Sequence, residues 1–419
     1  MARVRGFGKL QAAAVAFAAV SESRLLTPRF ALIVTAGFAY FGALGMVLPT
    51  LPLYVERALD AGNVAVGVVV GSFAVGAIAL RPAVGRVGDR LGRRPLLITG
   101  AVVVAVSILG QIWIDAIPGL VGLRLLGGLG EAAFFVGAAT MITDMAPPAR
   151  RGEAISFWSV AVYGGLGLGP PLGVWIEEHH SFDTVWTVAG ALALGAFVLA
   201  LFTRETRDPD LAVVTGPQPL INRNALIPGL FLAVCLAPLI GFTAFGALYM
   251  EEIGLRNAGL VYFVYGISVL VVRIVGAKVP DRLGPRIGGT VAAIGGGISG
   301  LVFALIANPV GVFIGAAILA LGLSQLYPAA TLLSLTDAPA GESASIIGTV
   351  CAFFDLASSV GPVLFGLMVT ATSYRLAFAL TGVIAILSLF VLRSDPRTAT
   401  QRWFRGAPDV EFTEPPLGT

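Results

Sequence analysis

The chain has 419 residues, of which 57% are hydrophobic and 12% are charged, and its formal net charge is +3. Its mean hydropathy of +0.89 excludes an ordinary soluble globular protein, whose polar surface outweighs its core. The small net charge gives no indication of nucleic-acid binding. We therefore expect a protein that lies in a lipid bilayer.

Long apolar stretches recur along the whole chain. A helix needs about 20 mostly apolar residues to cross the hydrocarbon core of a bilayer. A β-barrel would instead give segments of about ten residues with alternating polarity. The sequence therefore predicts an all-α membrane protein with twelve transmembrane helices. In chain order they cover approximately residues 30–55, 64–84, 95–114, 117–144, 153–176, 184–203, 225–250, 257–277, 287–306, 309–335, 343–371 and 375–392.

The positions of lysine and arginine predict how these helices are oriented. If the N-terminus is cytoplasmic, 21 of the 27 basic residues fall on the cytoplasmic side, as the positive-inside rule requires. Both termini are then cytoplasmic, and the protein crosses the inner, or plasma, membrane many times. The expected parts are a cytoplasmic segment 1–27, a six-helix bundle 28–203, a cytoplasmic linker 204–224, a second six-helix bundle 225–395 and a cytoplasmic tail 396–419.

Two sequence motifs repeat at the same offset of 192 residues. The stretch RPAVGRVGDRLGRR, residues 81–94, aligns with RIVGAKVPDRLGPR, residues 273–286. The pair Gly169-Pro170 aligns with Gly361-Pro362 at that offset. Two landmarks at one offset indicate that the second half of the chain is a copy of the first. Parallel repeats of this kind form the two halves of transporters that rock around a site at the midplane.

The segment GRVGDRLGRRP, residues 85–95, resembles the loop 2–3 signature of the major facilitator superfamily, and the resemblance extends over residues 28–395. It implies the major facilitator fold, with two pseudo-symmetric six-helix bundles. In that family the loop is thought to fasten the two halves on the cytoplasmic side when the central cavity opens outward. The residues expected in this conformational latch are Gly85, Asp89, Arg90, Gly92, Arg93, Arg94, Asp281 and Arg282.

Few acidic residues fall well inside the predicted helices. An ionisable side chain at that depth costs at least about 2.5–3.5 kcal/mol, so it marks a functional path by default. The stretch RLLGGLGEAA, residues 124–133, resembles the helix 4 signature of proton-coupled members of the family. Its arginine faces either the cavity or a structural partner on a neighbouring helix. The residues expected to take part in proton coupling are Glu131, Asp355 and Arg124.

Two roles stay open for Asp355. It either contacts Arg273 or Arg81 as a structural partner, or it titrates together with Glu131. The first predicted helix carries no charge between Phe30 and Val55. An exporter with this sequence must therefore place its protonation on the two deeply buried carboxylates.

The stretch YGGLGLGPPLGV, residues 163–174, resembles the glycine-proline signature of helix 5 in efflux antiporters of the family. Val174 departs from that signature, because a second terminal glycine is usual there. Glycines spaced by four residues give a smooth face for tight packing, and a proline removes a backbone hydrogen bond. Ordinary packing of small residues is the alternative explanation. The motif residues are Gly165, Gly169, Pro170 and Gly173.

Together these motifs predict proton-coupled efflux, or antiport, of amphipathic or hydrophobic small molecules by alternating access. The alternative within the same fold is a proton-coupled uptake symporter for a small polar metabolite such as a sugar or an organic acid. An enzyme is disfavoured, since no nucleophile–base constellation, metal cluster or phosphate loop appears. We expect a monomer that meets its substrate, protons and lipids, with no cofactor, metal or nucleic acid. The side chains expected in the substrate cavity are Tyr40, Trp158, Tyr163, Phe242, Gln325 and Tyr327.

Overall fold

The computed structural model is helical, without β-strands, over the part of the chain that it describes. Eleven helical segments are long and apolar enough to cross a membrane, and Ala258–Val272 adds a shorter apolar helix. These segments correspond to the twelve stretches predicted from the sequence. Most of the predicted N-terminal segment, linker and C-terminal tail lies outside the description. The described residues are 25–147, 150–207, 221–255, 258–275, 279–336 and 343–398.

Six long helices form the first half of the chain. The Thr27 hydroxyl accepts a hydrogen bond from Phe30 N at 3.2 Å and caps the first helix. The Ser181 hydroxyl caps the last of the six in the same way, by accepting from Thr184 N at 3.2 Å. The helices are α2 (Pro28–Arg57), α3 (Asn63–Leu91), α4 (Arg93–Gly110), α5 (Ile117–Met145), α6 (Arg151–His179) and α7 (Phe182–Leu201).

The second half of the chain contains two interrupted spans. The stretches expected as single helices break at Leu236 and at Ser324–Gln325, and Pro238 and Pro328 follow the breaks. A proline has no N–H to donate, so it weakens the helix at that point. The helices are α8 (Leu226–Cys235), α9 (Ala237–Glu252), α10 (Ala258–Val275), α11 (Val279–Leu305), α12 (Pro309–Leu323), α13 (Leu326–Leu335), α14 (Ser343–Ala371) and α15 (Tyr374–Ser394).

The backbone conformation repeats at the same offset as the sequence motifs. Gly92 and Gly284 stand 192 residues apart and both have positive φ, of 102° and 73°. Glycine adopts this region without the steric cost that a Cβ brings. Helix α6 and helix α14 also begin and end at positions that differ by the same offset. The two halves are therefore structural copies.

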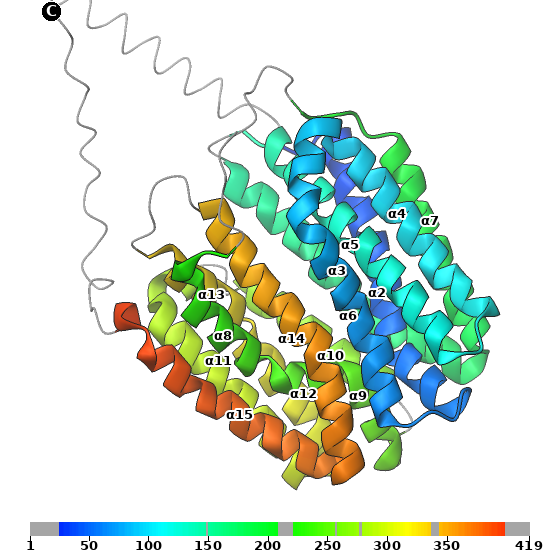
Figure 1. Cartoon of the computed structure of the whole chain (residues 1–419), viewed down its shortest axis with the longest axis vertical. Coiled ribbons are helices and arrows are strands. Elements are labelled where there is room, and N and C mark those ends of the chain that lie inside the picture. The colour runs from blue at the N-terminus through cyan, green and yellow to red at the C-terminus, as the bar shows by residue number, and fades with distance from the viewer. Residues whose placement is uncertain are drawn as a thin grey trace, which may run out of the picture.

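The two halves form two bundles that lie side by side (Figure 1). The starts of α2 and α8 and the ends of α7 and α15 lie at one end of the molecule, which we call the linker end. Helix α3 packs on α14 across the boundary. A Cβ added to Gly71 would collide with the carbonyl of Ser359, so the two helices touch through their backbones.

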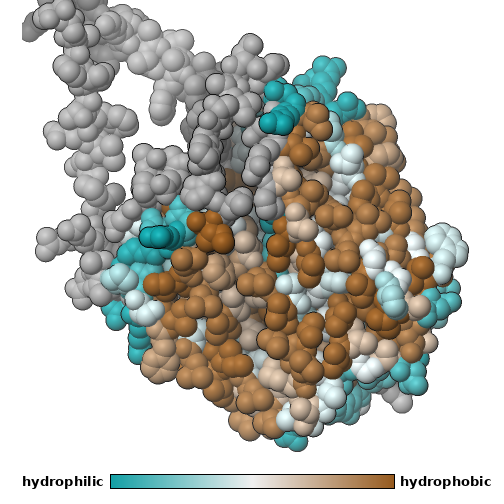
Figure 2. All heavy atoms as spheres, viewed as in Figure 1, coloured by the Kyte–Doolittle hydropathy of each residue, from teal (hydrophilic) through white to brown (hydrophobic). Residues whose placement is uncertain are grey.

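The outer surface is apolar over its middle and polar at its two ends. Figure 2 shows hydrophobic side chains across both bundles, with hydrophilic ones gathered toward the upper left and toward the lower right. Large apolar side chains are exposed on the molecule, among them Leu364, Val271 and Phe390. A soluble monomer rarely exposes so much continuous apolar surface. The protein therefore spans a membrane many times, with this belt facing the lipid chains.

The glycine face of α6 lies against α2. A Cβ added to Gly169 would stand 2.5 Å from the carbonyl oxygen of Gly42, and one added to Gly173 would stand 2.6 Å from that of Met46. A Cβ on Gly165 would stand 2.7 Å from the backbone of α2 as well. The small residues thus allow the two helices to approach closely, as in other membrane bundles.

We expect Gly169→Val to destabilise the purified protein, because its side chain has no room against α2. Overpacking of this kind costs about 1–3 kcal/mol. The measurement is the midpoint temperature of unfolding in detergent. Gly195→Val is the control, since a Cβ at this α7 position meets no atom within 4 Å. Equal midpoints for the two variants would contradict the close packing of α6 on α2.

Candidate functional site

Three charged side chains gather between the two bundles. Arg81 of α3 forms an ion pair with Asp355 of α14 through Nε and Oδ2, and its Nη2 donates to Oδ1 at 3.1 Å. Glu131 of α5 approaches the same guanidinium, with 3.7 Å between Oε2 and Nη2. The side chains of Asp355 and Glu131 are only 5% and 13% exposed. Two nearly buried carboxylates therefore share one arginine.

Close helix packing brings these three side chains together. A Cβ added to Gly128 of α5 would collide with the carbonyl of Phe73 on α3, and one on Gly76 would collide with that of Leu125. Glu131 lies one turn after Gly128, so it projects near the same contact. Ser359 lies one turn after Asp355 on α14, and its carbonyl contacts Gly71 of α3. This contact holds Asp355 close to α3.

Arg124 lies apart from this three-charge cluster. Its side chain is buried, and its guanidinium carbon stands 4.3 Å from the centre of the Phe73 ring. This geometry is a cation–π interaction, which is stronger when the cation is desolvated. Among the residues that the structure describes, no carboxylate pairs with Arg124. Arg124 and Glu131 thus share a helix but contact different partners.

Further polar side chains lie beside the cluster. The Tyr327 hydroxyl stands 3.3 Å from Cys351 Sγ, and Cys351 lies one turn before Asp355 on α14. Tyr163 of α6 lies within electrostatic range of Tyr327, and both rings are partly buried. Gln325 is buried at the break between α12 and α13, and its side-chain oxygen has no hydrogen-bond partner among the described residues. The sequence reasoning missed Cys351, although its spacing of four residues from Asp355 would have indicated it.

The other residues expected in the cavity lie in packed aromatic clusters. Tyr40 is fully buried and stacks on Phe134, with 3.7 Å between the ring centres. Phe242 is also buried and stacks on Phe303 at 5.6 Å. Trp158 fills the space over Gly37 on α2. The structure thus places these three rings in the interior of a bundle.

The loop between α3 and α4 is held by contacts within the first bundle. The Glu205 carboxylate accepts hydrogen bonds from Arg93 N at 2.9 Å and from Arg94 N at 3.0 Å. The Arg93 guanidinium approaches Asp144 of α5 at 3.4 Å. Arg207 donates to the carbonyl oxygen of Arg90 at 2.8 Å. The sequence reasoning missed Glu205, because it lies in the predicted linker, outside both repeated motifs.

The description covers only part of the predicted latch. Gly92 is the turn between α3 and α4, and a Cβ there would collide with the Glu205 carboxylate. The side chains of the remaining predicted latch residues lie outside the described part of the structure; these residues are Gly85, Asp89, Asp281 and Arg282.

Polar contacts join the two bundles at the end opposite the linker. Arg57 of α2 pairs with Glu177 of α6 at 2.6 Å and with Glu251 of α9 at 2.8 Å. The Tyr374 hydroxyl of α15 donates to the side-chain oxygen of Asn63 on α3 at 2.8 Å. The bundles are therefore fastened to each other at this end.

At the linker end the second bundle makes polar contacts within itself. Asn222 N donates to the Thr349 hydroxyl at 2.9 Å. Arg397 pairs with Asp395 at 2.6 Å and donates to the carbonyl oxygen of Asn224 at 2.8 Å. These contacts tie the start of α8 to α14 and to the end of α15, and they do not cross to the first bundle.

Comparisons with known proteins agree with this geometry. Residues 33–362 match the sequence profile of the Major Facilitator Superfamily. An uncharacterized MFS-type transporter of Salmonella typhimurium is 30% identical over 377 residues, which cover 85% of this chain and 94% of the relative. The multi-drug resistance efflux pump PmrA of Streptococcus pneumoniae is 26% identical over 377 residues, with 84% and 94% covered. A crystal structure of a mutant of the nucleoside transporter NupG has a TM-score of 0.75 at 13% identity, covers 87% of this chain and 99% of its own, and is similar in fold.

We expect Glu205→Gln to loosen the loop between α3 and α4 and to remove a pH dependence. Partial burial alone would raise the pKa of the Glu205 carboxyl, but four backbone N–H donors together lower it below its ordinary value. The contact is therefore complete at neutral pH, and it is lost on acidification, as the pH falls through the lowered pKa and the carboxylate takes up a proton. The strength of this contact is measured by the hydrogen exchange of the Arg93 and Arg94 backbone amides.

In the wild type, protection of these amides should fall on acidification, after correction for the intrinsic exchange rate. In the Glu205→Gln variant, protection should be low at every pH. Glu153→Gln is the control, because Glu153 is an exposed carboxylate that pairs with Arg150. If the Glu205 variant kept wild-type protection, the carboxylate would not be what holds this loop.

We expect Arg81→Met to cost about 3–5 kcal/mol of unfolding free energy, because it leaves two buried carboxylates without a cation. The triple variant Arg81→Met, Glu131→Gln, Asp355→Asn should regain most of that loss, since no charge is left buried. Arg150→Met breaks an exposed pair with Glu153 and should cost at most about 1 kcal/mol. Unfolding in mixed detergent micelles measures all three. A triple variant no more stable than Arg81→Met would refute the electrostatic origin of the loss.

Proposed function

Because the chain belongs to the Major Facilitator Superfamily, and is thus a multi-pass membrane transporter rather than an enzyme, we propose that it is a proton-coupled exporter of amphipathic or hydrophobic small molecules. The observation that carries this proposal is the shared arginine. Arg81 holds one carboxylate in its own bundle and one in the other bundle. A movement of the bundles and a movement of a proton are then linked.

The coupling step follows from the cost of an unpaired charge. If α3 and α14 move apart, Arg81 leaves Asp355, and a buried carboxylate without a partner is strongly unfavourable. Asp355 avoids that cost when it takes up a proton. Arg81 stays beside Glu131, because both lie in the first bundle, and it favours the ionised form of Glu131. Asp355 is therefore ionised while it pairs with Arg81 and protonated when it does not, and Arg81 keeps Glu131 as its partner in both arrangements.

The arrangement of cross-bundle contacts supports alternating access. The Arg57 ion pairs and the Tyr374–Asn63 hydrogen bond fasten the bundles at the end opposite the linker. The positive-inside rule places the linker end in the cytoplasm. The structure then corresponds to a state that is closed toward the outside. Opening outward requires these contacts to break and a latch at the linker end to form, for which the loop after α3 is the candidate.

Two observations support export as the direction. The relative named as a multi-drug resistance efflux pump aligns with 84% of this chain. The glycine face of α6, which resembles the signature of efflux antiporters, packs tightly on α2. One observation favours the alternative, an uptake symporter for a polar metabolite. The buried side-chain oxygen of Gln325 has no partner among the described residues and is free to receive a donor from such a substrate.

Substitution of the two carboxylates tests the coupling. We expect Glu131→Gln and Asp355→Asn each to abolish export driven by a pH difference in liposomes, while binding of the substrate persists. The amides keep the shape of the protonated acids but cannot exchange a proton. Asp183→Asn is the control, since Asp183 is an exposed carboxylate at the start of α7. If both variants kept full pH-driven export, neither residue would carry the proton.

A growth assay tests the direction and the class of substrate. The protein is expressed in a host that lacks its own efflux pumps, and the cells are challenged with a panel of toxic compounds and fluorescent dyes. Lower dye accumulation together with an inward proton flux is the expected result. Proton-driven accumulation of a polar metabolite would favour the symporter instead.

A further inference from the structure

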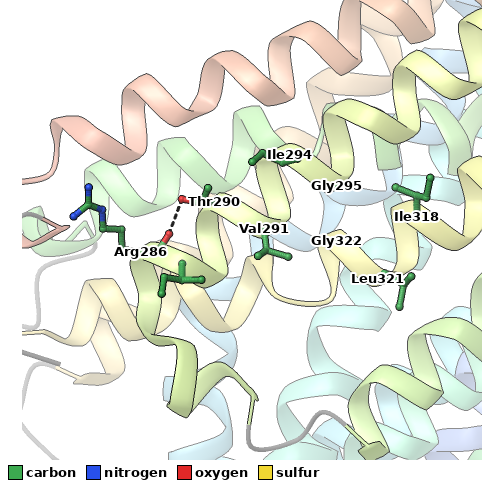
Figure 3. A pocket seen from close by; sticks show the side chains of 9 residues that line it. Arg286, Thr290, Val291, Ile294, Gly295, Ile318, Leu321 and Gly322 are labelled. Carbon is green, nitrogen blue, oxygen red and sulfur yellow. Dashed lines mark hydrogen bonds between the residues drawn. The ribbon is translucent and has the colours of Figure 1, made fainter. Parts of the chain in front are cut away.

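An apolar groove runs along the outer side of the second bundle between α11 and α12 (Figure 3). Its volume is about 430 Å³, within the range of small-molecule sites, which is about 300–1,000 Å³. Val291 and Ile294 of α11 and Ile318 and Leu321 of α12 line its walls. Three of these side chains, Val291, Ile294 and Leu321, are between 40% and 55% exposed, so the groove opens onto the lipid-facing surface.

Two glycines that line the groove, Gly295 and Gly322, mark the place where α11 and α12 touch through their backbones. A Cβ added to Gly295 would stand 2.6 Å from the Cα of Gly322. The equivalent residues of the first bundle, 192 positions earlier, are Val103 and Gly130. There the valine side chain occupies the contact, 2.9 Å from a Cβ added to Gly130. The second bundle therefore has a glycine where its copy has a valine side chain.

A cation lies at the linker end of the groove. Arg286 is exposed in the first turn after Gly284, and Figure 3 shows it beyond the apolar side chains on α11. Its guanidinium makes no hydrogen bond or ion pair with the residues that the structure describes. Its equivalent, Arg94, donates through Nη2 to the carbonyl oxygen of Leu201 at 3.0 Å and through its amide to Glu205.

The neighbouring residues make this rim more positive. The position equivalent to Glu205 in the second bundle is Arg397, and the position equivalent to Leu201 is Arg393, which is exposed. Leu392 packs against Gly289, so the end of α15 lies beside the start of α11. Arg397 is paired with Asp395, so the exposed cations at this end of the second bundle are Arg286 and Arg393.

We propose that this groove binds one anionic phospholipid, with its phosphate at Arg286 and an acyl chain between α11 and α12. The apolar walls match a hydrocarbon chain, and the cationic rim selects for a negatively charged headgroup. The rim lies at the end that the positive-inside rule places in the cytoplasm, where basic pockets between helices bind acidic headgroups. The site is independent of the Arg81 cluster and of the direction of transport.

Native mass spectrometry of the full-length protein tests the proposal. The delipidated protein is titrated in detergent with phosphatidylglycerol and, separately, with phosphatidylcholine. We expect one phosphatidylglycerol to bind in preference to phosphatidylcholine, and Arg286→Gln to weaken its binding about fivefold. Val291→Trp should fill the groove and prevent binding of either lipid at this site. Leu321→Trp fills it from the opposite wall and serves if the first variant does not fold.

Two control variants distinguish this site from general effects of charge or bulk. Arg29→Gln removes an exposed arginine at the linker end of α2, and Val106→Trp adds a ring at an exposed position on α4. Both should bind phosphatidylglycerol as the wild type does. Unchanged binding in Arg286→Gln, or equal affinity for the two lipids, would overturn the proposal. The proposal would also be overturned if the wild-type protein formed a dimer and Val291→Trp dissociated it. The groove would then be covered by a second copy of the chain.

Discussion

The structure depends on the cost of burying charge at the boundary between its two bundles. Arg81, Glu131 and Asp355 lie on three different helices, and each charge is tolerated only because an opposite charge is within reach. Such proximity requires helices that approach to backbone contact. The glycines on α3 and α5 supply that approach within the first bundle, and Gly71 supplies it toward α14. The close packing of α3 on α5 and on α14 is thus what brings both carboxylates within reach of one arginine.

Sequence reasoning predicted those features that depend on local signals. The length of an apolar stretch is enough to predict a membrane helix, whatever the helix packs against. A duplicated motif, such as the one around Gly92 and Gly284, is enough to predict a repeat. Buried carboxylates also stand out, because an apolar stretch seldom contains one. The helix breaks at Leu236 and Ser324 were missed, since a proline in a membrane helix does not by itself interrupt it; α6 continues through Pro170.

Partners across the bundle were not predictable from the sequence. Asp355 and Arg81 are 274 residues apart, and the sequence left Arg81 and Arg273 as equal alternatives. A helix that is apolar on every side carries no pattern that fixes its rotation about its own axis. For this reason Tyr40 was expected in the cavity, although the structure stacks it on Phe134 inside the first bundle. The face of each helix that points inward follows from its contacts with neighbouring helices, such as the close approaches at glycines.

The two interrupted spans have a mechanical consequence for the whole molecule. In the first bundle α2 and α5 run without a break, whereas their copies in the second bundle are divided into α8 and α9 and into α12 and α13. A continuous helix resists bending because each turn is bonded to the next, and a break removes that resistance at one point. The second bundle therefore has two points, at Leu236 and at Ser324–Gln325, where a helix can change direction and the matching helix of the first bundle cannot do so in the same way.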